Sequence, residues 1–192
     1  MRTKILGIGI DVLKRKQVLN KALGFIRDNE GKCKIVITPN PEIIMIARKD
    51  NELAETMDKA EMVIPDGVGV VWASKYSEHK LEETVPGCDL CYSLLEVAST
   101  EGFSAYLLGA KPGVAEQAKI NMENKYPGLN ICGVHDGYFN KDNEQTIIDE
   151  INNLSPDILL VGLGVPRQEK WLNEHKGNLR DRKSTRLNSS HT

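Results

Sequence analysis

Short apolar runs alternate along the chain with longer segments in which apolar residues recur every three or four positions. Several of the short runs are almost continuously apolar, which is typical of strands that are covered on both faces. The pattern predicts strands in six places, namely Lys4–Ile10, Lys34–Thr38, Met62–Pro65, Ala105–Gly109, Asn130–His135 and Ile158–Gly162.

The longer segments predict amphipathic helices between these strands. Each has one apolar face, which we expect to form core rather than cofactor contacts. The four faces comprise Val18, Leu19, Ala22, Leu23 and Ile26; Ile43, Ile46, Ala47, Leu53, Ala54 and Met57; Val114, Ala115, Ala118, Met122 and Tyr126; and Ile147, Ile148, Ile151 and Leu154.

The alternation of strands and helices predicts an α/β protein with a Rossmann-like layered fold, in which helices flank a largely parallel sheet. We expect a core over residues 1–179 made of two closely packed α/β lobes, joined by a helix near Gly87–Ser99. Residues 180–192 have no core periodicity and carry four basic residues against one acidic residue. They are predicted to be a disordered tail or a mistranslated end, with a basic membrane arm as the alternative.

Composition narrows the function classes. The chain has 192 residues, of which 40% are hydrophobic and 27% charged, as in an ordinary soluble globular domain. Its net charge of -2 gives no reason to expect a nucleic-acid partner. Without a signal pattern or an apolar stretch of about 18 residues, the chain is expected to be cytoplasmic or attached to a membrane from outside.

The cysteines permit a redox or metal interpretation only at one place. Cys88 and Cys91 have the CxxC spacing of a redox pair or of half a zinc site. No second CxxC or HxxxH completes a metal site, and Cys33 and Cys132 lie in apolar, strand-like runs. We therefore predict reduced, structural cysteines, with neither a metal nor a cofactor.

Polar residues follow the predicted strands, and in doubly wound sheets ligands bind at the carboxyl ends of strands. Thr38 and Asn40 come after the strand that ends near Ile37, where they either bind a ligand or cap a helix. Asp66 follows another strand and precedes two glycines, so its carboxylate either accepts a proton from an attacking hydroxyl or caps a helix.

A glycine turn after the strand Ala105–Gly109 suits a phosphate group. Gly109 closes the strand, Lys111 adds a positive charge, and the N–H groups of the following helix would face the same point. The segment is neither a GxGxxG nor a Walker A sequence, which disfavours dinucleotide and ATP binding. The alternative is a purely structural tight turn.

Two further loops offer groups for a nucleotide. Arg167 is placed to face a diphosphate and Gln168 to donate and accept hydrogen bonds, unless the arginine is only a solvated helix charge. Asp136, Gly137 and Tyr138 follow a fifth strand, and the tyrosine ring is placed to cover a base or a sugar. Their alternative is a turn with a packed aromatic residue.

The sequence contains no Asp-x-Asp motif, which sugar-nucleotide transferases commonly use to hold a divalent ion on the diphosphate. Nor does any His, Cys and carboxylate cluster have metal-binding spacing. The charge of a leaving diphosphate would therefore be met by N–H groups and basic side chains, which predicts a metal-independent mechanism.

Taken in order, these loops resemble the WecG/TagA/CpsF glycosyltransferase family. The resemblance extends approximately from Leu6 to Leu179, and each fragment is weak alone while the combination and order are specific. The motifs that carry it are TPNPEIIMIA, VIPDGVGVVWAS, PGCDL, YLLGAKPGVAEQA, GVHDGYF and ILLVGLGVPRQEKW.

The resemblance implies an inverting transfer of N-acetylmannosamine from UDP-ManNAc to the 4-hydroxyl of GlcNAc on undecaprenyl diphosphate, as in wall teichoic acid linkage-unit synthesis. Asp66 matches the family's proposed catalytic base, and Thr38 and Asn40 match polar residues near the reacting sugar. Gln168 matches another pocket position, and Tyr138 the nucleotide end. The resemblance also implies a peripheral protein at the cytoplasmic face of the membrane.

This chain departs from the family in two places. Family members usually carry an arginine shortly before Gly-x-Asp-Leu, where this chain has Glu83–Gly87. They also continue beyond Leu179 into a segment associated with membrane docking and with completing the active site. An inactive nucleotide-sugar-binding module is therefore one alternative, and a relative that uses UDP-ManNAcA or UDP-glucose is another. Apolar surface exposed without that segment would favour a homo-oligomer.

Overall fold

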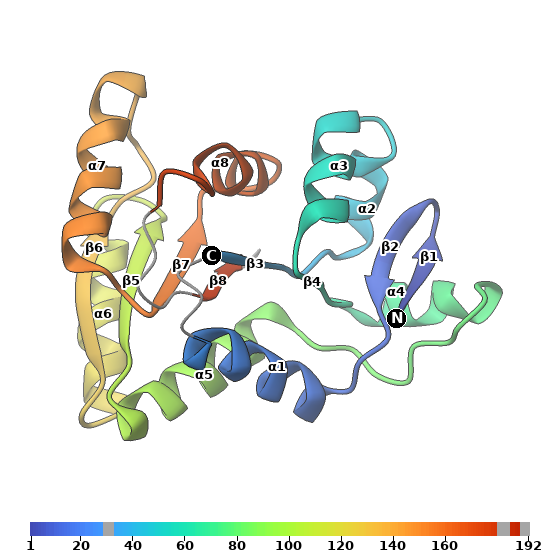
Figure 1. The fold of residues 1–192 in the computed structure, drawn as a ribbon, viewed down its shortest axis with the longest axis horizontal. Coiled ribbons are helices and arrows are strands. Elements are labelled where there is room, and N and C mark those ends of the chain that lie inside the picture. Colours follow the sequence, from blue (N-terminus) through green and yellow to red (C-terminus); the bar gives the residue numbers. More distant parts are fainter. Residues whose placement is uncertain (29–32, 180–184, 189–192) are drawn as a thin grey trace.

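The computed structural model describes residues 1–28, 33–179 and 185–188, the last of these by their backbone (Figure 1). No helix in these ranges is long and apolar enough to cross a bilayer. The helices are α1 (Arg15–Arg27), α2 (Pro41–Ala47), α3 (Asn51–Lys59), α4 (Val68–Ala73), the 3-10 helix η1 (Ser74–Tyr76), α5 (Gly87–Glu101), α6 (Val114–Lys125), α7 (Lys141–Leu154) and α8 (Arg167–His175). The strands are β1 (Arg2–Ile5), β2 (Ile8–Asp11), β3 (Lys34–Ile37), β4 (Met62–Val63), β5 (Ser104–Gly109), β6 (Asn130–His135), β7 (Ile158–Gly162) and β8 (Thr185–Asn188).

A parallel sheet in the order β4-β3-β8-β7-β5-β6 forms the middle layer. Strands β1 and β2 form a separate antiparallel hairpin. The prediction of an α/β protein with a largely parallel sheet flanked by helices is confirmed.

Alternate side chains of β3, β4, β5 and β7 enter two different cores. In β5, Ala105 and Leu107 belong to one apolar cluster and Tyr106 and Leu108 to the other. The first cluster includes the buried faces of α1 and α5, and the second those of α2, α3, α7 and α8. Figure 1 shows α1, α5 and α6 below the sheet and the other group above it. Burial on both faces explains why these strands are almost continuously apolar in sequence.

The predicted strand Lys4–Ile10 is wrong, because the segment is a hairpin. Leu6 and Gly7 form its two-residue turn, with φ angles of 51° and 91°. Two consecutive positive φ values give the turn that best fits the twist of a hairpin, but leucine rarely adopts such a conformation. Because Leu6 occupies the first turn position, the sequence lacks the Asn-Gly or Asp-Gly pair that usually marks such a hairpin turn.

The apolar face predicted over residues 43–57 belongs to two helices rather than one. Helix α2 ends at Ala47 and α3 begins at Asn51. Asp50 caps α3, since its Oδ1 accepts a hydrogen bond of 3.0 Å from the Leu53 N–H. An aspartate that caps a new helix ends the previous one even though the apolar periodicity continues.

Part of the predicted tail forms a strand. The backbone of β8 pairs in parallel with β3 on one side and β7 on the other, so the prediction of disorder is wrong for these four residues. Their sequence, TRLN, lacks the apolar run by which the other strands were recognised. The remaining residues of that tail, 180–184 and 189–192, lie outside the described part of the chain. The origin of the tail stays a prediction.

Candidate active site

The parallel strands bring five loops to one edge of the sheet, where they form two groups. The loops after β3 and β4 carry Thr38, Asn40 and Asp66, and those after β5, β6 and β7 carry most of the other candidate residues. Strand β8 lies between β3 and β7. The two groups are therefore separated by two strand spacings, about 10 Å.

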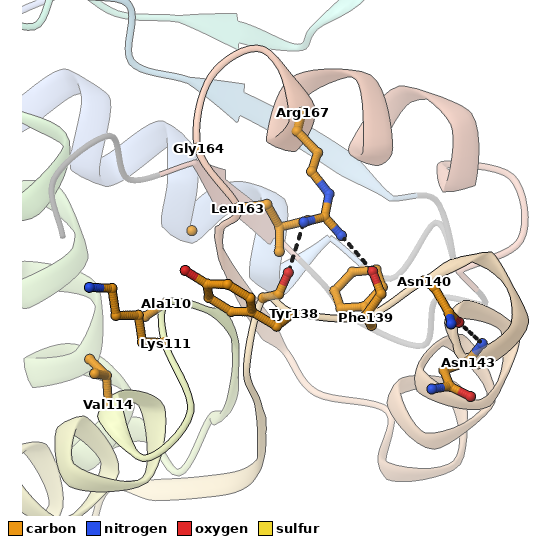
Figure 2. Close-up of a pocket in the computed structure, with 12 residues that line it drawn as sticks. Ala110, Lys111, Val114, Tyr138, Phe139, Asn140, Asn143, Leu163, Gly164 and Arg167 are labelled. Carbon is orange, nitrogen blue, oxygen red and sulfur yellow. Dashed lines mark hydrogen bonds between the residues drawn. The ribbon is translucent and has the colours of Figure 1, made fainter.

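A cleft of about 930 Å³ opens between the loops after β5, β6 and β7. Helix α6 leads from β5 to β6, away from β7, so the connections diverge at the β5–β7 boundary. Such a divergence is where doubly wound sheets bind ligands. The cleft is lined by Ala110, Lys111, Val114, Gly137, Tyr138, Phe139, Asn140, Asn143, Gly162, Leu163, Gly164 and Arg167 (Figure 2).

Backbone hydrogen bonds tie these three loops together. The Ala110 N–H donates to the Gly162 carbonyl (3.0 Å), and the Gly137 N–H donates to the Ala110 carbonyl (2.8 Å). Gly109 has a φ of 139°, and a Cβ atom there would lie 2.2 Å from the Gly162 oxygen. Only glycine permits this approach of the two strand ends, so Gly109 acts through the shape of the cleft.

The N-terminus of α6 suits an anion. Its N-cap is Gly113, with a φ of 84° and no side chain to bond the first N–H groups. Val114 and Lys111 line the cleft beside them. The Val114 N–H donates to the Lys111 carbonyl (3.0 Å), and the N–H groups that follow it have no side-chain cap. These groups, the helix dipole and a lysine together favour a phosphate group at this end of the cleft.

Tyr138 lies across the cleft. Its side chain is 70% exposed, and Figure 2 shows the ring between Lys111 on one side and Arg167 on the other. The Tyr138 N–H donates to Asp136 Oδ1 (2.7 Å), so Asp136 fixes the turn and does not line the cleft. An exposed ring held by such a turn offers a flat apolar surface to a base or a sugar.

Arg167 holds the loop that carries Tyr138. Its Nη1 donates to the Gly137 carbonyl (2.8 Å) and its Nη2 to the Phe139 carbonyl (3.2 Å), while the guanidinium lies 4.6 Å from the centre of the Phe139 ring. These contacts occupy donors that were expected to face a diphosphate. Arg167 therefore lines the cleft and positions one of its walls.

Gln168 is fully buried beneath the cleft. Its Oε1 accepts from the Gly164 N–H (3.1 Å) and its Nε2 donates to Glu169 Oε1 (3.2 Å). Both ends of the amide are thus used inside the protein. In this structure Gln168 supports the Gly164 loop and does not reach the cleft surface.

Asp66 lies in the group of loops after β3 and β4, where it is only 4% exposed. Its Oδ2 accepts a hydrogen bond of 3.1 Å from the N–H of Gly87, the first residue of α5, where the helix dipole stabilises negative charge. Within the described residues, Oδ1 has no hydrogen-bond donor. Oδ2 therefore caps a helix, as in the alternative interpretation, and Oδ1 has no hydrogen-bond partner among the described residues.

Thr38 and Asn40 follow β3, and their loop lies next to the loop that carries Asp66. A Cβ atom on Gly87 would lie 2.6 Å from Thr38 Oγ1, so a glycine is needed to bring the start of α5 against Thr38. The Asp66 N–H donates to the Pro39 carbonyl (3.1 Å), which joins the two loops. Asn40 caps α2, since its Oδ1 accepts from the Ile43 N–H (2.9 Å).

Thr84 stands in the segment where the family usually has an arginine. Its Oγ1 accepts from the Gly67 N–H (2.7 Å) and donates to the Pro65 carbonyl (3.2 Å), which braces the Asp66 loop. Arg15 of α1 donates from Nε to the Thr84 carbonyl (3.0 Å) and pairs with Asp89 (3.2 Å). A guanidinium thus lies beside this segment, although it comes from another element.

The four cysteines all lie within the described residues. All four are free thiols, and burial raises the pKa of Cys91 to about 12, so it stays protonated near neutral pH. Across the ranges that the structure describes, no group of His, Cys, Asp and Glu has a metal-binding arrangement.

Sequence reasoning missed two kinds of residue at this edge. Asn140 and Asn143 line the cleft, and Asn140 Oδ1 accepts from the Asn143 N–H (3.1 Å) as the cap of α7. Gly87 joins Asp66 to α5. An asparagine before a helical segment is a recognisable cap signal, but the role of Gly87 depends on side chains distant in sequence.

Comparisons with known proteins agree with the motifs. The model of the glycosyl transferase WecG/TagA/CpsF family matches residues 3–185. Among curated proteins, the N-acetylglucosaminyldiphosphoundecaprenol N-acetyl-beta-D-mannosaminyltransferases of Staphylococcus aureus strains NCTC 8325 / PS 47, COL and N315 are similar to this chain. Each is 30% identical over 175 residues, which cover 91% of this chain and 68% of the relative.

Proposed function

Because the chain belongs to the WecG/TagA/CpsF family of glycosyltransferases, we propose that it transfers N-acetylmannosamine from UDP to the 4-hydroxyl of GlcNAc carried on undecaprenyl diphosphate. The named activity of the Staphylococcus aureus relatives supports this choice of donor and acceptor. The reaction would belong to wall teichoic acid linkage-unit synthesis, on a protein peripheral to the inner face of the cell membrane.

The observation that carries the proposal is the cleft with an uncapped helix N-terminus, at the same sheet edge as a buried carboxylate. UDP would lie in the cleft, its base or ribose against Tyr138 and its diphosphate at Lys111 and the start of α6. The sugar would extend toward Thr38, Asn40 and Asp66, across the space of about 10 Å set by two strand spacings.

The chemistry is a single in-line displacement. The acceptor oxygen forms a bond to C1 of the sugar, the bond from C1 to the β-phosphate oxygen breaks, and UDP leaves with the electron pair. Oδ1 of Asp66 takes the proton of the hydroxyl, a role that typically contributes about 10²–10⁴-fold. An α-linked donor then gives a β-linked product.

Metal independence is part of the proposal. The N–H groups of α6 and Lys111 would neutralise the diphosphate that a divalent ion neutralises in other sugar-nucleotide transferases. Transfer should therefore continue in EDTA. A strict requirement for added Mg²⁺ or Mn²⁺ would contradict this part.

The decisive experiment is a donor panel of UDP-ManNAc, UDP-ManNAcA and UDP-glucose, each assayed against a lipid-linked GlcNAc acceptor. We expect ManNAc transfer, with a β linkage in the product by NMR. Preference for another sugar would move the chain to a different branch of the family. The double variant Cys88→Ser, Cys91→Ser should retain full activity, since the thiols have no role in this mechanism.

A second candidate is a nucleotide-sugar-binding module without turnover. One observation favours it, since Asp66 is only 4% exposed. Saturable UDP-ManNAc binding without any product in the transfer assay would support the module over the enzyme.

A further inference from the structure

Helix α4 and the following η1 expose three large apolar side chains in a row. Val68 is 78% exposed, Trp72 59% and Tyr76 80%. Their spacing of four residues puts them on one side of the helical segment, and the Trp72 and Tyr76 rings meet edge to face with centres 5.5 Å apart. We call these three residues the apolar stripe. The opposite side of the same segment is buried through Val70 and Ser74.

The apolar stripe is attached directly to the loop of the proposed base. It begins two residues after Asp66. A Cβ atom on Gly69 would lie 2.8 Å from Pro41, so α4 packs closely against the residue that follows Asn40. The position of the stripe is therefore fixed relative to the candidate acceptor site.

We propose that the apolar stripe docks the protein on a lipid bilayer, with Trp72 and Tyr76 at the headgroup level. The inference rests on the proposed function, because there the acceptor hydroxyl is joined to the lipid only through one sugar and a diphosphate. Asp66 must then work close to the bilayer surface, and the stripe is the apolar surface next to it. Tryptophan and tyrosine rings favour this interfacial region.

Charge indicates how the docking would be driven. The segment from Val68 to Lys80 contains two lysines, Lys75 and Lys80, against Glu78. So small an excess of positive charge attracts anionic lipids weakly compared with a polybasic segment. Burial of the apolar stripe should supply most of the affinity, so binding should depend little on salt.

Tryptophan fluorescence tests the proposal directly. The chain has two tryptophans, and Trp171 is 4% exposed, so Trp72 is the one that lipid can reach. On adding vesicles of phosphatidylethanolamine and phosphatidylglycerol, we expect a shift of the emission to shorter wavelength and protection from acrylamide. Brominated phospholipids should quench the same signal. The variant Trp171→Phe isolates the Trp72 signal, and the wild-type protein gives the same reading if that variant does not fold.

Vesicle co-sedimentation supplies the matched comparison. The double variant Trp72→Ser, Tyr76→Ser should lower the vesicle partition coefficient about tenfold or more, since two large apolar anchors are lost. The control Ile120→Ser removes a side chain of 52% exposure from α6 and should change nothing. Equal sedimentation of the double variant and wild type, with no change in Trp72 emission, would overturn the proposal. A shift of the emission together with a doubled mass in the absence of vesicles would also overturn the proposal, because these results indicate that a second copy of this chain covers the apolar stripe.

Two acceptors separate this inference from the proposed function. With a water-soluble, short-chain acceptor, the double variant should transfer at the wild-type rate. With an acceptor embedded in vesicles, its kcat/KM should fall in proportion to its partition coefficient. If wild type binds vesicles through Trp72 but transfers to neither acceptor, the proposed function fails and the docking surface stands. An unchanged kcat/KM of the double variant on the embedded acceptor would contradict the docking surface but not the proposed function.

Discussion

On the proposed mechanism, one carboxylate would combine a structural and a chemical role. Asp66 Oδ2 accepts a hydrogen bond at the start of α5, and Oδ1, which has no hydrogen-bond donor among the described residues, would take the proton of an acceptor hydroxyl. Asp66→Asn keeps an oxygen for the Gly87 N–H but cannot take a proton. We expect kcat to fall by about 10²–10⁴-fold, with UDP affinity nearly unchanged because Asp66 does not line the cleft.

Steady-state transfer kinetics and a UDP titration measure both halves of that expectation. The matched control is Asp89→Asn, an exposed carboxylate in the first turn of the same helix, which should leave kcat close to wild type. Wild-type turnover in Asp66→Asn would remove this residue from the mechanism.

Arg167 offers a second prediction for a single residue. Replacing it with lysine keeps the charge but loses the two-carbonyl contact and the stacking on Phe139. The Tyr138 loop should loosen, and the Kd for UDP should rise by about tenfold. A hydrogen bond to a charged group is worth about 1.5–3 kcal/mol when it is buried, and these bonds contribute less because they are partly exposed. Isothermal titration calorimetry checks this. If Arg167→Lys bound UDP as wild type does, the guanidinium would have no positioning role.

Single residues were predictable to different degrees. Lys111, Gly137, Tyr138 and Arg167 line the cleft, because residues just after a strand emerge at the sheet edge, while their binding of a substrate stays a prediction. Sequence could not show that Gln168 is buried, because that depends on how α8 packs against its neighbours.

Two glycine substitutions test the backbone conformation inside α1 and at the end of β5. Gly24 lies inside α1, and a Cβ atom there would meet nothing within 4 Å, so Gly24→Ala should raise the free energy of unfolding by about 0.5–1 kcal/mol. Gly109→Ala should lower it by more than about 2 kcal/mol, since its φ is positive and its Cβ would meet Gly162. Urea unfolding compares the two. Similar effects of both changes would contradict the described strand ends.

The contact between α3 and α8 predicts a pH effect. Lys170 lies 2.7 Å from Asp50, and this hydrogen bond, with the Leu53 N–H, holds the pKa of Asp50 below its ordinary value. A depressed carboxyl pKa stabilises the fold above the ordinary value of about 4, and the contribution is lost as pH falls through the folded-state pKa.

Asp50→Asn preserves the cap and removes the charge that faces Lys170, while the contact of Lys170 with Glu52 (2.7 Å) stays in place. At pH 7 the variant should be less stable than wild type, and the difference should disappear as the pH is lowered below about 4. Unfolding measured across this range provides the check. A difference that persisted unchanged in strong acid would show that the ion pair is not its source.

Elements were predicted well where an apolar run fills a strand. Strands β6 and β7 have the predicted bounds, Asn130–His135 and Ile158–Gly162. The hairpin at Leu6 was missed because an apolar residue occupies a turn position, and β8 because its sequence is polar. In each of these cases tertiary context decides, not local periodicity.

For the whole molecule, UDP should act as a stabilising ligand. Binding to the folded state alone adds RT ln(1 + [L]/Kd), about 2.7 kcal/mol at a concentration of 100 Kd. On the proposed metal-independent mode, thermal unfolding should show the same stabilisation by UDP with and without EDTA. Stabilisation that appears only when Mg²⁺ is added would place an ion in the cleft.

The class of fold followed from sequence, and so did the sheet edge at which the candidate residues gather, because parallel strands must place their carboxyl ends together. The division of that edge into two groups did not follow. It depends on β8 standing between β3 and β7, and strand order is set by packing of whole layers rather than by any short segment.

The hairpin β1–β2 also has a consequence for solubility. Strand β4, at one border of the sheet, is two residues long, and its Val63 N–H is taken by Asp11 Oδ2 at 2.8 Å. A short border strand whose outward N–H is already bonded offers no template to another polypeptide. The first residues of the chain thereby guard the protein against strand-to-strand aggregation, and shortening them would open that border before it disturbed the cleft.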